Sequence, residues 1–131
     1  MGQKEQIAPL ALIVEDDADE RHLAAALLEE TDLHVIECES AEAALSVMQR
    51  CGERILLVFV DIRLPGIIDG VDLARVVRMH WPHARVIVTS GNPGDRLDHL
   101  PHEAAYMQKP WRALDVLIAA EEALAARPTA A

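Results

Sequence analysis

The sequence predicts an α/β fold in which five parallel strands form one doubly wound sheet with helices on both faces. Short apolar segments alternate with amphipathic segments along the chain, a pattern typical of parallel strands joined by crossover helices. The apolar segments lack strict polar alternation, as expected for strands that are buried on both sides. The chain has 131 residues, of which 51% are hydrophobic, so a single core and a single domain are expected.

The first half of the chain is expected to supply three strands and two helices. The strands are predicted at 10–14, 32–38 and 54–61, and the helices at 17–30 and 41–50. Acids open the first helix, as a helix dipole favours, and Ser40 is a typical N-cap for the second. Helical spacing predicts that the second helix buries Ala43, Ala44, Val47 and Met48, before Cys51 and Gly52 end it.

The second half is expected to contain two helices, two strands and one weak segment. The helices are predicted at 69–82 and 111–127, and the strands at 84–91 and 104–110. Prolines bracket the weak segment 92–103, which predicts a short or irregular fourth helix. The buried stripes are predicted to be Leu73, Val76 and Val77 in the first of these helices, and Leu114, Leu117, Ile118 and Leu124 in the last. We expect an N-terminal extension at 1–7, one domain at 8–127 and a tail at 128–131.

Composition excludes several partners. The net charge is −10, which argues against binding the phosphate backbone of nucleic acids. No stretch approaches a membrane span and no secretory signal is visible, so we expect a cytoplasmic protein without a membrane partner. Cys38 and Cys51 are interpreted as free thiols.

Polar side chains follow the apolar strands at the points where the strands end. They are Glu15 and Asp16 after the first strand, Asp61 at the end of the third, Thr89 at the end of the fourth and Lys109 after the fifth. In open parallel sheets, ligands bind at this edge. Clustered carboxylates repel one another, and Mg²⁺ offsets that repulsion with oxygen ligands. We therefore predict a metal site at Glu15, Asp16 and Asp61, with a backbone carbonyl near Arg63 as a further ligand.

The same residues suit phosphoryl transfer. A carboxylate such as that of Asp61 can attack phosphorus and hold an acyl phosphate. A divalent cation and the Lys109 ammonium would neutralise charge on the transferred oxygens. The Thr89 hydroxyl would donate a hydrogen bond to one of them.

Five fragments, "LIVEDD", "VDIRLPG", "DG", "VIVTSG" and "QKP", occur in an order that resembles the response-regulator receiver domains of two-component signalling. The resemblance covers roughly residues 8–127. It implies a flavodoxin-like fold with strand order 2-1-3-4-5, a phosphoacceptor at Asp61, and Mg²⁺ or Mn²⁺ held by Glu15, Asp16, Asp61 and the carbonyl of Arg63. Thr89 and Lys109 resemble the phosphate-binding hydroxyl and lysine of that family, Tyr106 resembles its aromatic switch, and the bond to Pro110 resembles one that is cis in the family.

The resemblance also implies partners and regulation. A histidine kinase or a histidine phosphotransfer protein would supply the phosphoryl group, and an unknown downstream protein would receive the signal. The chain would be a phosphoacceptor with self-catalysed phosphotransfer and dephosphorylation, not an enzyme, and a monomer or a weak phosphorylation-dependent dimer. Two alternatives stay open: a receiver-like adaptor that works without phosphorylation, and a receiver fragment of a hybrid histidine kinase.

The chain departs from the family pattern in three ways, one of which is the short fourth-helix region that Pro93 and Pro101 break. "PGIIDG" is one residue longer than the common "PGMDG", so the loop after Asp61 is expected to be displaced. No output domain is visible in the sequence, so DNA binding by this chain is not expected. A phosphatase of the haloacid-dehalogenase type would need a general acid where Arg63 stands, and a nucleotide-binding module would need a glycine-rich loop. Trp81 and Trp111 are expected to pack at helix ends.

Overall fold

The computed structural model describes residues 8–92, 94 and 96–126 of the chain. Its five strands form one parallel sheet in the order β2-β1-β3-β4-β5, which confirms the predicted topology. The strands are β1 Leu10–Val14, β2 His34–Cys38, β3 Ile55–Asp61, β4 Arg85–Ser90 and β5 Ala105–Gln108. The expected N-terminal extension and the tail lie outside the described residues.

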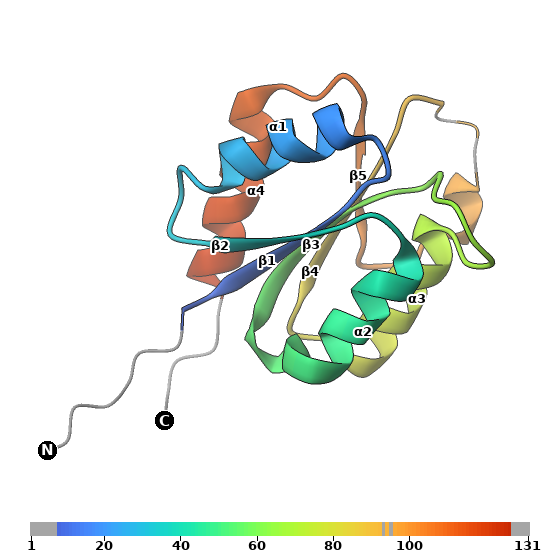
Figure 1. Ribbon diagram of the computed structural model, residues 1–131, viewed down its shortest axis with the longest axis horizontal. Helices are drawn as coiled ribbons and strands as arrows, with labels where there is room; N and C mark the ends of the chain where they lie inside the picture. Colours follow the sequence, from blue (N-terminus) through green and yellow to red (C-terminus); the bar gives the residue numbers. More distant parts are fainter. Residues whose placement is uncertain (1–7, 93, 95, 127–131) are drawn as a thin grey trace, which may run out of the picture.

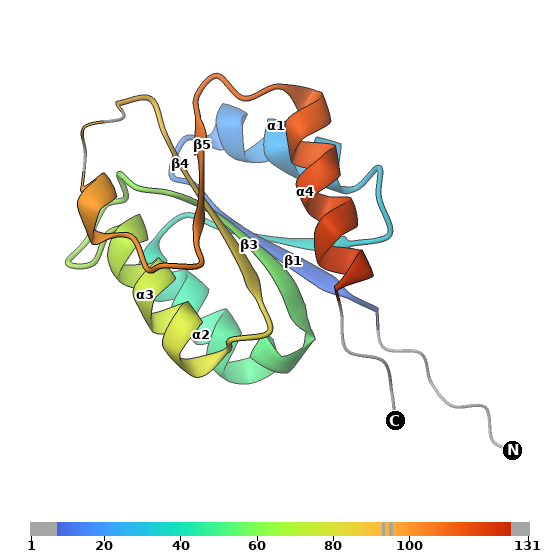
Figure 2. The same ribbon diagram turned by 180° about the vertical axis from the view of Figure 1, so that it is seen from behind.

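Four helices cover the two faces of the sheet (Figures 1 and 2). Their bounds are α1 Ala18–Leu28, α2 Ala41–Cys51, α3 Gly70–His80 and α4 Ala113–Ala125. Helices α1 and α4 lie together on one face, whereas α2 and α3 cover the other. Between β4 and β5 the described residues form only a 3₁₀ turn, η2 Leu97–His99, which agrees with the predicted irregular fourth helix. A second 3₁₀ turn, η1 Gly52–Arg54, leads into β3.

Local hydrogen bonds explain where the helices begin. The Asp17 side chain accepts from the Glu20 amide at the start of α1, and Ser40 caps α2 through the Ala43 amide, as predicted. Asp69 and Asp72 form a reciprocal capping box at the start of α3. These caps satisfy amide groups of α1, α2 and α3 that have no partner within the helix. Helices α1 and α2 therefore begin within four residues of the strand ends that precede them, whereas α3 begins only after the longer loop that follows Asp61.

The sheet separates two apolar clusters. All seven residues of β3 are buried, because this central strand has helices on both faces. Its side chains alternate between the two clusters: Val58 and Val60 face α2 and α3, while Phe59 faces α1 and α4. The strand is therefore held rigidly up to Asp61, its last residue.

The predicted buried stripe of α4 is wrong. Leu114 and Ile118 are 65% and 46% exposed, and Leu117 and Leu124 are only half-buried. The helix instead buries Val116, Ala119, Ala120 and Ala123. Small alanine side chains let α4 pack closely against its neighbours, so the larger aliphatic side chains remain outside. In α2, Ala43 is likewise exposed and Ala41 takes the buried position.

In the part of the chain that the structure describes, no helix is long and apolar enough to cross a membrane.

Candidate functional site

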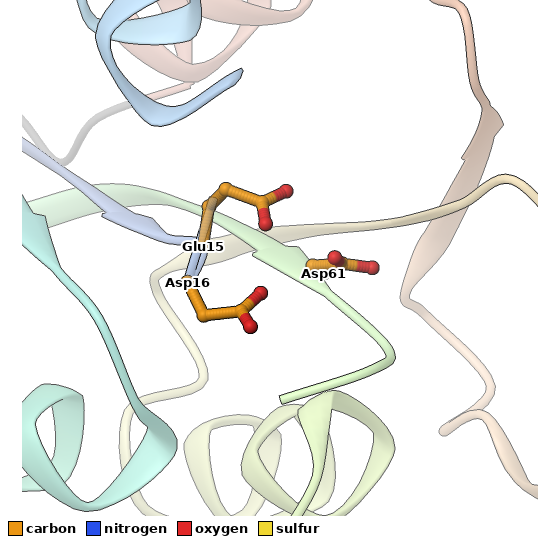
Figure 3. Close-up of side chains that lie close together, drawn as sticks. All are labelled: Glu15, Asp16 and Asp61. Carbon is orange, nitrogen blue, oxygen red and sulfur yellow. The ribbon is translucent and has the colours of Figure 1, made fainter. Parts of the chain in front are cut away.

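Three carboxylates meet where β1 and β3 end (Figure 3). Glu15 and Asp16 directly follow β1, and Asp61 ends β3. One oxygen from each of the three lies within 4.8 Å of the others. Glu15 and Asp61 are buried, at 5% and 7% exposure, whereas Asp16 is exposed. The sheet register, which aligns Val14 with Val60, causes this convergence. The donor set of clustered carboxylate oxygens is the one that Mg²⁺ prefers, so the residues fit such an ion.

Lys109 supplies the positive charge next to the acids. Its Nζ donates to Glu15 Oε1 at 2.8 Å and to Asp61 Oδ2 at 3.1 Å. It also pairs with Glu20 Oε1 on α1 at 2.5 Å. Strand β5 ends just before Lys109, whose amide donates to the Ser90 carbonyl at 2.9 Å and whose bond to Pro110 is cis, as the resemblance implied.

The charges of the cluster do not balance. Burial raises the pKa of Glu15 to about 7; repulsion by Asp61 acts in the same direction, while Lys109 and the Asp17 amide oppose it. Burial alone would lower the pKa of Lys109, but its carboxylate partners raise it above its ordinary value. One ammonium group is thus shared among Glu15, Glu20 and Asp61, and the site retains an excess of negative charge that a divalent cation would offset.

Thr89 lies beside Asp61 on the neighbouring strand, as predicted. The two residues are register partners in the β3–β4 ladder, and Thr89 is only 1% exposed. Its Oγ1 accepts a hydrogen bond from the indole Nε1 of Trp111 at 3.0 Å. The indole ring in turn packs edge-on against Phe59, with ring centroids 5.4 Å apart. Trp111 is therefore more than the packing residue that the sequence suggested.

Tyr106 lies on the other face of the sheet. Its half-buried ring packs with the α2 and α3 cluster, together with Leu97 and Leu100. Its hydroxyl donates to the Ser90 carbonyl at 3.0 Å. Tyr106 and Thr89 are thus connected through the end of β4 and not by direct contact, since Thr89 bonds to Trp111 on the opposite face.

The loop after Asp61 carries the extra residue noted in the sequence. The Arg63 amide donates to Asp61 Oδ1 at 3.3 Å, which orients the Asp61 carboxylate. Gly66 has a φ of 102°, a value that favours glycine. One residue later, the Ile67 amide donates to Glu42 Oε2 at 3.2 Å. This bond ties the lengthened loop to the first turn of α2.

Two contributors to the site were missed in the sequence. Glu20 lies in the first turn of α1, where an acid is typical of a helix start. Trp111 is typical of a residue that packs at a helix end. Glu20 contacts Lys109 and Trp111 contacts Thr89 only in the folded chain, and no sequence pattern indicates either contact.

Comparison with known proteins identifies the family. The family model of the response regulator receiver domain matches residues 11–120. The chain belongs to this family. Receiver domains are signalling phosphoacceptors and not classical enzymes, and the acidic triad of Glu15, Asp16 and Asp61 is typical of their Mg²⁺ sites.

Two curated relatives and a solved structure agree with this assignment. The receiver domain is 35% identical to the transcriptional regulatory protein AruR of Pseudomonas aeruginosa, over 72% of this chain and 38% of that protein. It is 33% identical to the response regulator protein FleR of the same organism, over 93% of this chain and 26% of that protein. It thus spans between about a quarter and two fifths of these relatives' length. A receiver domain protein from Clostridium thermocellum is 25% identical, with a TM-score of 0.78, over 89% of this chain and 94% of that one.

Proposed function

We propose that this receiver domain is a phosphorylation-dependent signalling switch that accepts a phosphoryl group on Asp61. The donor would be the phosphohistidine of a histidine kinase or of a histidine phosphotransfer protein. The observation that carries the proposal is the position of the Asp61 carboxylate, which lies within the acidic triad and 3.1 Å from Lys109 Nζ.

In the proposed reaction, an Asp61 carboxylate oxygen attacks the phosphorus atom. The new bond is an oxygen–phosphorus bond, the phosphorus–nitrogen bond of the donor breaks, and its electron pair stays on the imidazole nitrogen. Lys109 Nζ lies close enough to Asp61 to neutralise negative charge that develops on the phosphoryl oxygens. The Arg63 amide, already bonded to Asp61 Oδ1, keeps the carboxylate oriented.

Glu15, Asp16, Asp61 and the backbone carbonyl of Arg63 would hold Mg²⁺ or Mn²⁺. When bound, the cation offsets the negative charge of the acids and of the transferred group. This role is supported by the imbalance in the cluster, where a single ammonium faces three carboxylates.

The Thr89 hydroxyl and Lys109 would bind the phosphoryl group. Tyr106, on the opposite face of the sheet, would change position in response. The shared link is Ser90, whose carbonyl accepts from the Tyr106 hydroxyl and from the Lys109 amide. A shift of Thr89 would therefore move the acceptor to which Tyr106 is bonded. The target that reads this change is a further protein, which the receiver would engage as a monomer or as a weak phosphorylation-dependent dimer.

Intact-mass measurement with acetyl phosphate and Mg²⁺ tests the proposal. We expect the wild type to gain one phosphoryl group and Asp61→Asn to gain none. Asp32→Asn, a matched change at an exposed acid, should label like the wild type. Equal labelling of Asp61→Asn and wild type would refute Asp61 as the acceptor, and no labelling of the wild type would favour the phosphorylation-independent adaptor.

A further inference from the structure

The indole N–H of Trp111 donates a hydrogen bond to the buried side chain of Thr89. The bond is 3.0 Å long from Nε1 to Oγ1, and Thr89 is 1% exposed. The indole is therefore the donor to Thr89 Oγ1 in a largely buried environment. Cis-Pro110 and the start of α4 flank Trp111, and its ring packs edge-on against Phe59 at 5.4 Å. The donor is fixed in place by packing.

A threonine hydroxyl has one proton and two acceptor sites. When the indole N–H occupies one acceptor site, the hydroxyl proton cannot point toward the indole and must point elsewhere. Thr89 shares its face of the sheet with Asp61, its register partner on β3. A proton directed away from Trp111 is thus available to an oxygen bound on Asp61.

We propose that Trp111 is a positioning residue that holds the Thr89 hydroxyl as a donor for the phosphoryl group on Asp61. This inference rests on the proposed function and adds a residue to it. Trp111 does not touch the reacting atoms. It acts through Thr89, because its N–H fixes which way a buried hydroxyl can donate, so that less ordering is needed when phosphate arrives.

The proposal also connects the site with α4. Trp111 lies directly before the N-cap of that helix, Arg112. Any movement of Thr89 toward the phosphoryl group therefore acts, through the hydrogen bond, on the Trp111 side chain next to the start of α4. The same indole also packs against the ring of Phe59.

The affinity for beryllofluoride, a phosphoryl mimic, measured by calorimetry in Mg²⁺ is the first test. Trp111→Phe keeps an aromatic ring against Phe59 and removes the N–H. We expect it to weaken beryllofluoride binding about fivefold, the factor that one typical hydrogen bond near 1 kcal/mol supplies, with Mg²⁺ affinity unchanged. Trp81→Phe, the same change at the end of α3, should leave both affinities unchanged.

A double-mutant cycle separates positioning from packing. In a Thr89→Val background the acceptor is gone, so Trp111→Phe should no longer change beryllofluoride affinity. In a Thr89→Ser background the hydroxyl returns, and so should the roughly fivefold effect. An equal loss in all three backgrounds would mean that Trp111 only packs, which overturns the inference.

A measurement on unaltered side chains keeps the test valid if Trp111→Phe folds poorly. The indole N–H resonance of Trp111 should shift when beryllofluoride binds to the wild type, while that of Trp81 should not. An unmoved Trp111 resonance overturns the inference alone. A wild type that binds no beryllofluoride in Mg²⁺ overturns both this inference and the proposed function.

Discussion

Gly70 is the residue whose replacement gives the sharpest test of how the site is built. It is the first residue of α3, it is buried, and its amide donates to the Ile62 carbonyl at 2.9 Å. A Cβ added at Gly70 would lie 2.1 Å from the backbone oxygen of Asp61 and 2.8 Å from the Ile62 Cα. Gly70 therefore lets α3 begin directly against the backbone of Asp61.

The expected cost of Gly70→Ala follows from this contact. Ordinary van der Waals contact starts near 3.4 Å, so α3 and the Asp61 peptide would have to separate by roughly 1 Å or more. The helix cannot move freely, because Val71, Leu73, Ala74 and Val77 anchor it in the core. Overpacking of this kind costs about 1–3 kcal/mol, and alanine recovers at most about 1 kcal/mol of helix propensity. We expect a net loss of about 1–2 kcal/mol.

Urea denaturation measures this loss. With a slope of about 1–3 kcal/mol per molar urea, the midpoint should fall by about 1 M in Gly70→Ala. Labelling by acetyl phosphate should slow as well, because the Asp61 backbone moves. Gly91→Ala is the matched control, since its added Cβ would meet nothing within 4 Å. A Gly70→Ala midpoint at or above that of Gly91→Ala would refute the steric reasoning.

Three further predictions concern the charges of the site. Millimolar Mg²⁺ should raise the melting temperature of the wild type but not of Asp16→Ala, because a ligand bound only by the folded state stabilises it; an unmoved wild-type curve would contradict the metal site. Burial raises the Glu15 pKa from 4.5 to about 7, so the folded state binds that proton more tightly, and in EDTA the free energy of unfolding should fall as pH rises from about 4.5 to 7. Glu15→Gln should remove that part of the decline, and an unchanged slope would count against it. Lys109→Gln should destabilise the metal-free protein by about 2–3 kcal/mol in urea, since buried Glu15 and Asp61 lose their cation; a wild-type midpoint would contradict this.

Much of the fold could be predicted because strand and helix signals in this chain are strong and agree with one another. Continuous apolar runs mark buried parallel strands, and Ser40 and the acids before α1 mark helix starts. The buried face of α4 could not be predicted in the same way. Its large side chains, Leu114 and Ile118, follow helical spacing, yet the space beside the sheet admits alanine and leaves them exposed. Side-chain size at a close helix contact depends on the partner surface, which the sequence of one helix does not contain.

The candidate site could be predicted where residues follow strand ends, and it was missed where contacts cross between elements. Register alone brings Asp61 beside Thr89, so both were found. Glu20 and Trp111 come from α1 and from the segment before α4, and they meet Lys109 and Thr89 only after the layers pack. No local pattern marks a helix acid as a lysine partner or an indole as a hydroxyl donor.

Strand β3 can end in an acid because its earlier residues stabilise the domain and only its last residue belongs to the candidate site. Ile55 to Val60 are almost fully buried on both faces, so the strand stays in place without help from its last residue. That rigidity permits Asp61 to sit 7% exposed next to a second buried acid, an arrangement that would be costly without compensation. Lys109 compensates only part of this charge, since Glu15 and Glu20 share it. The negative charge that Lys109 leaves uncompensated attracts a cation to the folded domain. The phosphoryl chemistry proposed for Asp61 depends on that cation.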